Sequence, residues 1–409
     1  MVNIDVLSVL KSAISQSMGA EYLDGSEIGG KLDVLSSDKI IDIGKDVLDG
    51  GSTETFYKSV LSVISEIVVD ARAYSGDLNV FMVKDNEWGG FIERIKVGLG
   101  TIVSDPKWNL AANAALNPAK IDYSSEELSY YPIPVSAKIF EEGKAIMCPV
   151  SKPVDQLKEA FLGVEQMTKF MSAIAQAVEN TLNLGLTSFR HMMAQDAIAL
   201  SVGSGTAVHL LTEAIAEGIL ENGTTANEAM QDPEFLTFAA ERIAEVRDNV
   251  KVLSSAYIPN GDTWFSPDGY DKLVLLSKFA RRVKFGVKAN TFNKDEIGFG
   301  EYTTTPAWQG IYTQTREQKF NFTDASTVLI AKSDDAADKL GITFGANDYW
   351  EQPFVIGLLF DKMAAGICPY KRKVTGKYVA VGDFFNEFYH NLLNCLLDAG
   401  YPVVAFVVD

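Results

Sequence analysis

Side chains that commonly do chemistry in enzymes are few in this chain, and they are not grouped. The three histidines, His191, His209 and His390, lie in apolar segments that predict helices or strands. None belongs to an H-E-x-x-H motif, in which a helix presents two imidazoles to one metal ion. We therefore interpret the histidines as structural or surface residues.

Neighbouring acidic residues occur at 126–127, 141–142 and 334–335. Paired carboxylates do acid–base work when the fold places them close together in a cleft, and sequence neighbours usually point away from each other. These pairs are interpreted as solvated loop charges. The cysteines, Cys148, Cys368 and Cys395, are widely spaced without a C-x-x-C pair, which argues against a disulfide framework and a zinc site and fits a reducing compartment.

One glycine-rich stretch, LSVGSGTAVHLLTEAI at residues 200–215, imitates a dinucleotide-binding loop. Gly203 and Gly205 precede a predicted helix, but Val208 stands where the G-x-G-x-x-G pattern requires its third glycine. The stretch is interpreted as a turn before a helix. Neither a G-x-S-x-G elbow nor a G-x-x-x-x-G-K-[ST] loop is present, so we expect no catalytic residue, cofactor or bound metal ion.

Composition indicates a folded, acidic protein. The 409 residues are 47% hydrophobic, enough for two or three domains with a sizeable core. Lys and Arg total 36 against 54 Asp and Glu, which gives a net charge of -18. No run of basic residues indicates sequence-specific binding of nucleic acid. We expect no secretory signal and no membrane segment, because no apolar run approaches the roughly 20 residues of a spanning helix.

The clearest periodic segment is residues 151–182, SKPVDQLKEAFLGVEQMTKFMSAIAQAVENTL. Apolar residues recur there at steps of three and four, which predicts one face of a helix. Ser151 is suited to cap this helix and Pro153 to lie in its first turn. At 1.5 Å per residue the predicted helix is roughly 45 Å long. A second helical segment at 188–198, a glycine-rich break and a helix at 208–219 follow.

The preceding stretch, residues 105–153, holds six of the 13 prolines and little helical period. Segments 129–140 (SYYPIPVSAKIF) and 144–150 (KAIMCPV) are typical of extended strands, and we predict that they form a hairpin that turns at Gly143. An isolated two-stranded ribbon is marginally stable in water. The predicted arm therefore needs a surface to lie on, from its own body or from a neighbouring subunit.

Other segments complete an α+β pattern without steady β-α-β alternation. Residues 1–50 indicate an arm with small helices. Helices are predicted at 52–74 and 234–250. In 263–282 we predict a short strand that ends at the Ser-Pro-Asp turn and a helix from about Gly269. Strands are predicted at 377–381, within 384–400 and at 401–409.

Taken in order, these parts resemble the major capsid proteins of tailed bacteriophages, whose fold is named for the phage Hong Kong 97. The small short-tailed phages of the phi-twenty-nine group are the most similar. Four segments carry the resemblance: SKPVDQLKEAFLGVEQMTKF (151–170), WFSPDGYDKLVLL (264–276), FNKDEIGFGEYTTTPAW (292–308) and DAGYPVVAFVV (398–408).

The resemblance implies an α+β fold with an N-terminal arm, an extended loop, a spine helix, and peripheral and axial domains. The arm and its helix would span 1–79, and the extension loop, an extended hairpin, 80–150. Residues 151–200 and 355–400 would form the peripheral domain. Residues 201–354 would form the axial domain, and 401–409 its terminal strand. Residues 325–363 offer two apolar strands where one is expected, so the end of the axial domain stays open.

The resemblance also implies a function as a structural protein that is not an enzyme and that self-assembles into an icosahedral or prolate shell around a phage genome. Expected partners are copies of itself in hexamers and pentamers, portal and scaffolding proteins, and double-stranded DNA contacted non-specifically, which an acidic inner wall would repel. The expected location is the virion capsid, assembled in the host bacterial cytoplasm. Residues expected at subunit interfaces are Trp108, Tyr130, Tyr131, Ile139, Glu141, Lys144, Lys158, Glu165 and Lys169.

Two alternatives stay open at this point. An encapsulin-type compartment would use the same fold to enclose an enzyme. A cytoplasmic hydrolase, such as a glycoside hydrolase with unrecognised carboxylates, would belong to a different class of protein.

Overall fold

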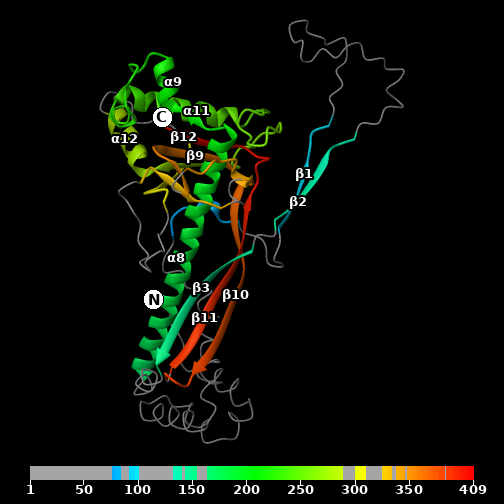
Figure 1. Ribbon diagram of the computed structural model, residues 1–409, viewed down its shortest axis with the longest axis vertical. Coiled ribbons are helices and arrows are strands. Elements are labelled where there is room, and N and C mark those ends of the chain that lie inside the picture. Colours follow the sequence, from blue (N-terminus) through cyan, green and yellow to red (C-terminus); the bar gives the residue numbers. More distant parts are fainter. Residues whose placement is uncertain are drawn as a thin grey trace, which may run out of the picture.

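The computed structural model describes residues 76–83, 92–100, 132–140, 143–153, 164–288, 300–309, 325–333, 338–345, 348–382 and 384–409. One helix, α8 (Val164–Ser204), organises them. Its 41 residues span about 60 Å at 1.5 Å per residue. Figure 1 shows three long strands beside its lower part and a lobe of helices and shorter strands around its upper end.

The start of this helix differs from the prediction. The sequence predicts a helix from 151, with a cap at Ser151, but residues 151–153 belong to β3 (Gly143–Pro153) and pair with another strand. Residues 154–163 lie outside the described residues. The helix also continues through the expected break after 182 and ends only at Ser204. Pairing with a strand more than 200 positions away decides the first difference, and local periodicity carries no information about it.

The three long strands form an antiparallel sheet, here called the stalk sheet, in the order β10 (Ala365–Val379), β11 (Phe384–Leu397), β3. Burial alternates along most of β11, as expected for a sheet covered on one face. The buried side includes Phe385, Tyr389 and Leu393, which share one core with Val178 and Leu182 of α8. The strand predicted within 384–400 is thus confirmed as β11, and the one predicted at 377–381 is confirmed as the end of β10 up to Val379, after which the chain turns.

The helix lies close to the stalk sheet at Gly185. A Cβ atom added there would lie 2.7 Å from Ile146 Cγ2 of β3, so glycine allows this close approach. Lower down, Arg372 of β10 forms an ion pair of 3.1 Å with Glu179, a carboxylate that is buried in α8. Packing and a paired charge therefore join the helix to both outer strands of the sheet.

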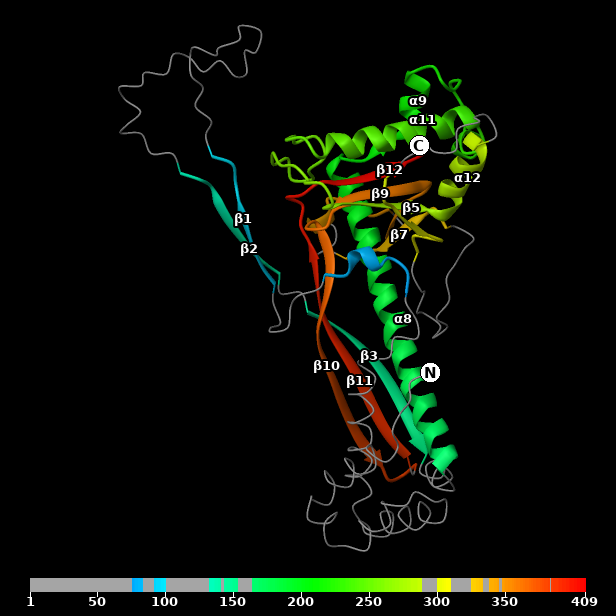
Figure 2. The same ribbon diagram turned by 180° about the vertical axis from the view of Figure 1, so that it is seen from behind.

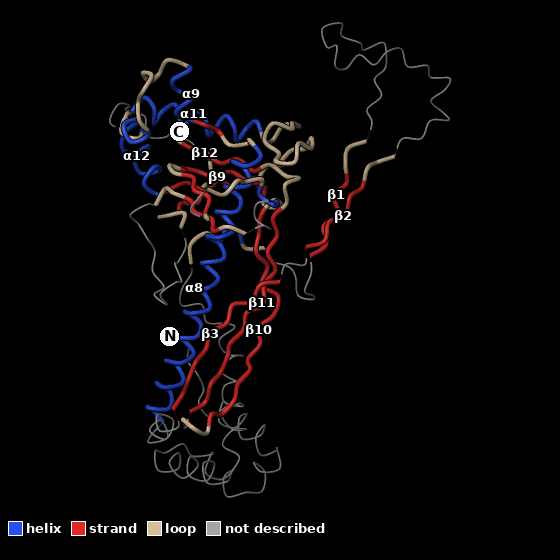
Figure 3. The backbone as a smooth tube through the Cα atoms, viewed as in Figure 1, coloured by secondary structure: helices blue, strands red, loops and turns tan. Residues whose placement is uncertain are grey.

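The hairpin predicted between 129–140 and 144–150 is wrong in its pairing. Strand β2 (Val135–Phe140) pairs with β1 (Ile92–Val97), whereas β3 pairs with β11. The adopted pairing buries Ile146 and Cys148 of β3 in the molecule. A local hairpin would have left these two side chains without that core, so burial outweighs proximity in sequence. Figure 3 shows the two-stranded ribbon apart from the stalk sheet.

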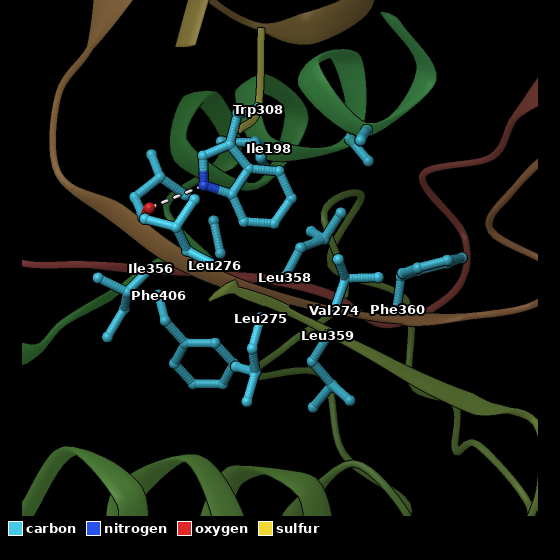
Figure 4. Packing of buried hydrophobic residues seen from close by; sticks show 14 of the residues in the cluster. Ile198, Val274, Leu275, Leu276, Trp308, Ile356, Leu358, Leu359, Phe360 and Phe406 are labelled. Atoms are coloured by element: carbon cyan, nitrogen blue, oxygen red, sulfur yellow. Dashed lines mark hydrogen bonds between the residues drawn. The ribbon is translucent and has the colours of Figure 1, made fainter. Parts of the chain in front are cut away.

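The lobe is built on a five-stranded sheet, here called the central sheet, in the order β4-β12-β9-β5-β6. Its strands are β4 (Val208–His209), β12 (Val403–Val407), β9 (Val355–Asp361), β5 (Asp271–Leu276) and β6 (Thr303–Thr305). Every residue of β9 and β12 is buried, which fits strands covered on both faces. Figure 4 shows this packing, in which Trp308 Nε1 donates a hydrogen bond of 2.7 Å to the Val355 carbonyl.

The described helices of the lobe are α9 (Leu210–Ala216), α10 (Ala226–Ala229), α11 (Pro233–Asn249) and α12 (Ser277–Lys288). The helix predicted at 234–250 is confirmed as α11. The prediction for 263–282 is wrong, because the chain turns at Gly269 and enters β5, and the helix begins only at Ser277. A short continuous apolar run such as DKLVLL fits a buried strand or a buried helix equally well.

The glycine-rich stretch marks the joint between α8 and the central sheet. Gly203 lies in the last turn of α8, where an added Cβ would meet the Leu340 carbonyl oxygen at 2.2 Å. Gly205 has a positive φ of 75° and ends the helix. The Ala405 amide donates to Ser201 Oγ at 2.8 Å, and Thr206 Oγ1 donates to the Val403 carbonyl at 2.8 Å. The stretch is a turn, as predicted, and it ties α8 to β12.

Two further elements lie near the joint between stalk and lobe. The short helix η1 (Asn79–Phe81) places Phe81 against Phe360 of β9, with stacked rings whose centroids are 4.5 Å apart. A two-stranded sheet pairs β7 (Val328–Ala331) with β8 (Tyr349–Gln352). The helix predicted at 52–74 and the arm at 1–50 lie outside the described residues.

Candidate subunit interface

The ribbon of β1 and β2 stands off from the side of the molecule, as Figures 1 and 2 show. Alternate residues of a strand point to opposite faces, and paired residues share a face. One side, here called the basic face, carries Arg94 and Lys96 of β1 and Lys138 of β2. The other side, here called the apolar face, carries Ile95, Val97, Val135 and Ile139, with Glu93 opposite Ile139 near one end of the ribbon.

The basic face is organised around one carboxylate of the body. Arg94 and Lys138 lie directly opposite each other in the ribbon, an arrangement that would be repulsive in an isolated pair of strands. Asp398, which follows β11, lies between them. Lys138 Nζ is 3.0 Å from its Oδ1, and Arg94 NH1 is 3.7 Å from its Oδ2. The side chains of Arg94 and Asp398 are both largely buried, so solvent screens this pair only weakly.

Arg94 has further partners in the body. It donates to the Met363 carbonyl, and its guanidinium lies 5.4 Å from the ring centroid of Tyr401. Burial lowers the pKa of Arg94, while Tyr401 and Asp398 act in the opposite direction. The guanidinium stays a cation at any physiological pH because its ordinary pKa is so high. Burial also raises the pKa of the Tyr401 hydroxyl, so this ring remains neutral.

Lys96 makes the second attachment. Its Nζ donates to the Gly400 carbonyl at 2.8 Å and lies 3.6 Å from Asp262. The same ammonium lies 4.6 Å from the ring centroid of Trp264, a distance at which cation–π attraction operates. These partners come from the loops before β5 and after β11. Arg94 and Lys96, neighbouring positions on one face of β1, thus contact three loops of the body: those after β9 and β11 and the one before β5.

The loop that accepts from Arg94 is itself fixed by a buried acid. Asp361, the last residue of β9, accepts from Ser266 Oγ at 2.6 Å and from the Met363 amide at 2.7 Å. Burial raises the pKa of this carboxyl, and the Ser266 hydrogen bond opposes the shift. The acceptor carbonyl of Met363 therefore belongs to a turn that the core holds in place.

Within the described residues, the apolar face has no contacts with the body like those that hold the basic face. Its side chains are 62% exposed at Ile95, 53% at Val97, 63% at Val135 and 55% at Ile139. Leu99 and Ile133, next to the ribbon ends, are also exposed. Exposed apolar residues scattered singly are ordinary, but a contiguous stripe on a projecting ribbon is typical of a surface that another chain covers.

Of the residues that the sequence predicts for subunit contacts, the structure places only Ile139 on this ribbon. Lys144 lies in β3, where its backbone pairs with Leu393, and Glu165 and Lys169 lie in the first turns of α8. The remaining predicted residues lie outside the described part of the chain: Trp108, Tyr130, Tyr131, Glu141 and Lys158.

Sequence reasoning missed the basic face and most of the apolar face. The pattern that could have shown them is the alternation in ERIKV at 93–97, which places arginine and lysine on one side and isoleucine and valine, with Glu93, on the other. Asp398 has no such local pattern. Its role follows only from its position against the ribbon.

The surroundings of the cysteines and histidines indicate structural roles. The three cysteines are buried without a disulfide, and across the described ranges no three His, Cys, Asp or Glu residues are grouped as metal ligands would be. His191 is buried, which lowers its pKa and keeps it neutral. His209 Nδ1 is 2.5 Å from Asp409 Oδ1, and His390 is hydrogen-bonded with Thr375. No helix in the described segments is long and apolar enough to span a bilayer.

The sequence model of the phi29-like phage major capsid proteins matches residues 34–407. The chain belongs to this family. As a major capsid protein it is a structural component that assembles with copies of itself into the capsid of a virion. The match favours a phage shell over an encapsulin-type compartment. The α+β fold, with the ribbon, the spine helix and the two body regions of the described residues, is that of tailed-phage capsid proteins, as the resemblance implies.

Solved phage structures are similar to this capsid protein at low identity. A chain in the capsid of Staphylococcus phage Andhra is 12% identical, with 84% of this chain and 86% of that chain covered and a TM-score of 0.48. A chain in the structure of native bacteriophage P68 is 11% identical, with 83% and 86% covered and a TM-score of 0.48. A chain in the capsid of Cyanophage P-SCSP1u is 12% identical, with 81% and 87% covered and a TM-score of 0.35. A comparison with curated protein sequences finds no match.

Proposed function

We propose that the capsid protein builds hexamers and pentamers by laying the apolar face of its β1–β2 ribbon on a neighbouring copy. This proposal rests on the difference in burial and contacts between the two faces of the ribbon. The basic face is engaged with the body of its own chain, and the four large apolar side chains of the other face are exposed. A second copy of the same chain is the partner that a self-assembling shell always supplies.

The attachment at Asp398 favours such a contact energetically. A free ribbon would lose orientational freedom on binding, and that loss opposes association. Here the ion pairs and the Gly400 hydrogen bond hold the ribbon before a neighbour arrives. Symmetry then repeats one modest contact around the whole shell. The remaining predicted contact residues, from Trp108 through Lys169, extend the same interface in this proposal.

The domain boundaries of the resemblance are also proposed for this chain: an arm at 1–79, an extension loop at 80–150, a peripheral domain at 151–200 and 355–400, an axial domain at 201–354 and a terminal strand at 401–409. The position of β10 and β11 beside α8 supports the peripheral domain. Strand β9 pairs within the central sheet, so the chain passes from lobe to stalk only after Asp361.

Further partners follow from the same role. We propose that the shell encloses double-stranded DNA with non-specific contacts, and that the net charge of -18 limits binding of the genome to the wall. Portal and scaffolding proteins and assembly in the host bacterial cytoplasm complete the proposal. The protein acts in it without catalytic activity.

Negative-stain microscopy and sedimentation of purified protein, with a scaffold where one is needed, test the ribbon contact. Val135→Asp combined with Ile139→Asp places two charges on the apolar face, and we expect a folded protein that forms no shells. Val381→Asp is the matched control, because Val381 is fully exposed in the turn after β10, away from the ribbon. Shells of the doubly substituted protein at the yield of the control would rule out the proposed contact.

A further inference from the structure

Helix α12 gives the lobe of this acidic protein a basic surface. Its solvent side carries Lys278, Arg281 and Lys284, together with Phe285, which is 76% exposed. No acidic residue occurs in the helix. Arg282 points inward and donates to the Met230 carbonyl at 2.7 Å. The remaining cations and the phenylalanine are here called the basic end of the lobe.

The C-terminal part of α11 has the opposite character. Glu241, Glu245 and Asp248 are exposed and follow one another at steps of four and three, so they share one side of the helix. Exposed Val252 and Leu253 follow a few residues after the helix ends at Asn249. These five residues are here called the acidic end of the lobe.

Nearby cations offset part of the negative charge of the acidic end. Arg242 is 2.8 Å from both Glu213 and Glu245, and Lys251 is 3.3 Å from Asp248. No ion pair of Glu241 with another described residue is present. Carboxylates of this end outnumber the cations beside them, so it remains negative.

The two ends cannot meet within one chain. Helix α12 lies at the N-terminal end of α11, where Arg282 reaches Met230. The 17 residues of α11 then run about 25 Å away from it. Figure 2 shows α12 on one side of the lobe and the segment that follows α11 on the other. Each end therefore presents charge and apolar area that the described part of its own chain leaves uncovered.

We propose that the basic end of one lobe docks on the acidic end of the lobe of the next copy. The two ends carry opposite charges, and in the proposed contact the exposed phenylalanine of one meets the exposed valine and leucine of the other. Because different surfaces of the same chain are joined, the contact is head-to-tail, and its repetition closes a ring of lobes. This inference rests on the proposed self-assembly and adds a second contact, independent of the ribbon.

Charge-reversal variants test the contact in the full-length protein. One variant combines Lys278→Glu with Arg281→Glu, and the other combines Glu241→Lys with Asp248→Lys. Each exposed ion pair is weak, but loss of two at every contact of a ring should raise the critical concentration for assembly by about tenfold or more. The quadruple variant keeps the wild-type net charge and restores opposite signs at every contact, so it should assemble like the wild type.

Mixing the two double variants gives a sharper result. Each can then contact the other but not itself, so rings of alternating copies form only with an even number of subunits, and rings of five are lost. Assembly of the α12 variant at the wild-type critical concentration, or a quadruple variant as defective as its parents, would overturn the inference. So would loss of duplex-DNA binding by the α12 variant with assembly unchanged, which would assign the basic end to nucleic acid.

The ribbon remains intact in all of these proteins, and circular dichroism checks that each is folded. If the charge variants behave like the wild type while the Val135→Asp, Ile139→Asp protein forms no shells, the lobe contact fails and the proposed function stands. If ribbon substitution has no effect while charge reversal and rescue work, the ribbon contact fails and the lobe contact stands.

Discussion

Arg94 and Lys138 face each other across the β1–β2 ribbon and share one carboxylate, that of Asp398. Two like charges in directly opposed positions disfavour a strand pair unless an opposite charge lies between them. The ribbon therefore needs a nearby anion, and the body of the molecule supplies it. The position of the ribbon thus depends on a single residue that is far away in the sequence.

Removal of that anion should release the ribbon. In Asp398→Asn the two cations remain opposed without compensation, and we expect docking of the ribbon to weaken by about 1–3 kcal/mol. Hydrogen exchange of the backbone amides at 92–97 and 135–140 measures this as faster exchange. Asp262→Asn is the matched control, because Asp262 is more exposed and lies 3.6 Å from Lys96, and its loss should cost well under about 1 kcal/mol. Equal exchange in both variants would contradict the role assigned to Asp398.

The contact between α8 and the stalk sheet gives a second prediction. Gly185→Ala places a methyl group 2.7 Å from Ile146 Cγ2 and should lower the free energy of unfolding by about 1–3 kcal/mol, despite the better helix propensity of alanine. Denaturant unfolding measures the change. Ile146→Ala removes Cγ2, the atom that the new methyl group would meet, so the double variant should be more stable than the sum of the single effects predicts. Strict additivity would show that the two residues do not press on each other.

The buried histidine of α8 predicts a pH dependence. Burial lowers the pKa of His191 in the folded state, so the unfolded chain takes up its proton first as the pH falls. In that window the unfolded state binds more protons, and the free energy of unfolding decreases from the ordinary pKa of histidine, about 6.5, down to the lowered folded value.

His191→Phe removes this titrating group and should flatten that part of the profile. The measurement is the difference in unfolding free energy between wild type and variant across the acid range, at constant ionic strength. A pH-independent difference would mean that His191 titrates alike in the folded and unfolded states.

The sequence by itself determined the elements whose patterns are local. The α+β class, helix α11, the strands near the C-terminus and the missing third glycine after Gly205 can all be read from spacing and residue type. The order of these elements was enough to indicate the capsid family. Alternation along 92–97 also fixes which side of that strand is basic, although not what it faces.

Only the tertiary structure decided which strands pair and what the paired faces touch. Strand β2 has a near neighbour in β3 but pairs with β1, because β3 buries Ile146 and Cys148 only beside β11 and α8. Ser151 and Pro153 have the residue types of a helix start, yet their hydrogen-bonding partners lie in β11. Lys96 and Gly400, which are 304 positions apart, meet through the folded chain alone. Burial and long-range hydrogen bonds select among local alternatives of similar free energy, and a local pattern contains no record of that selection.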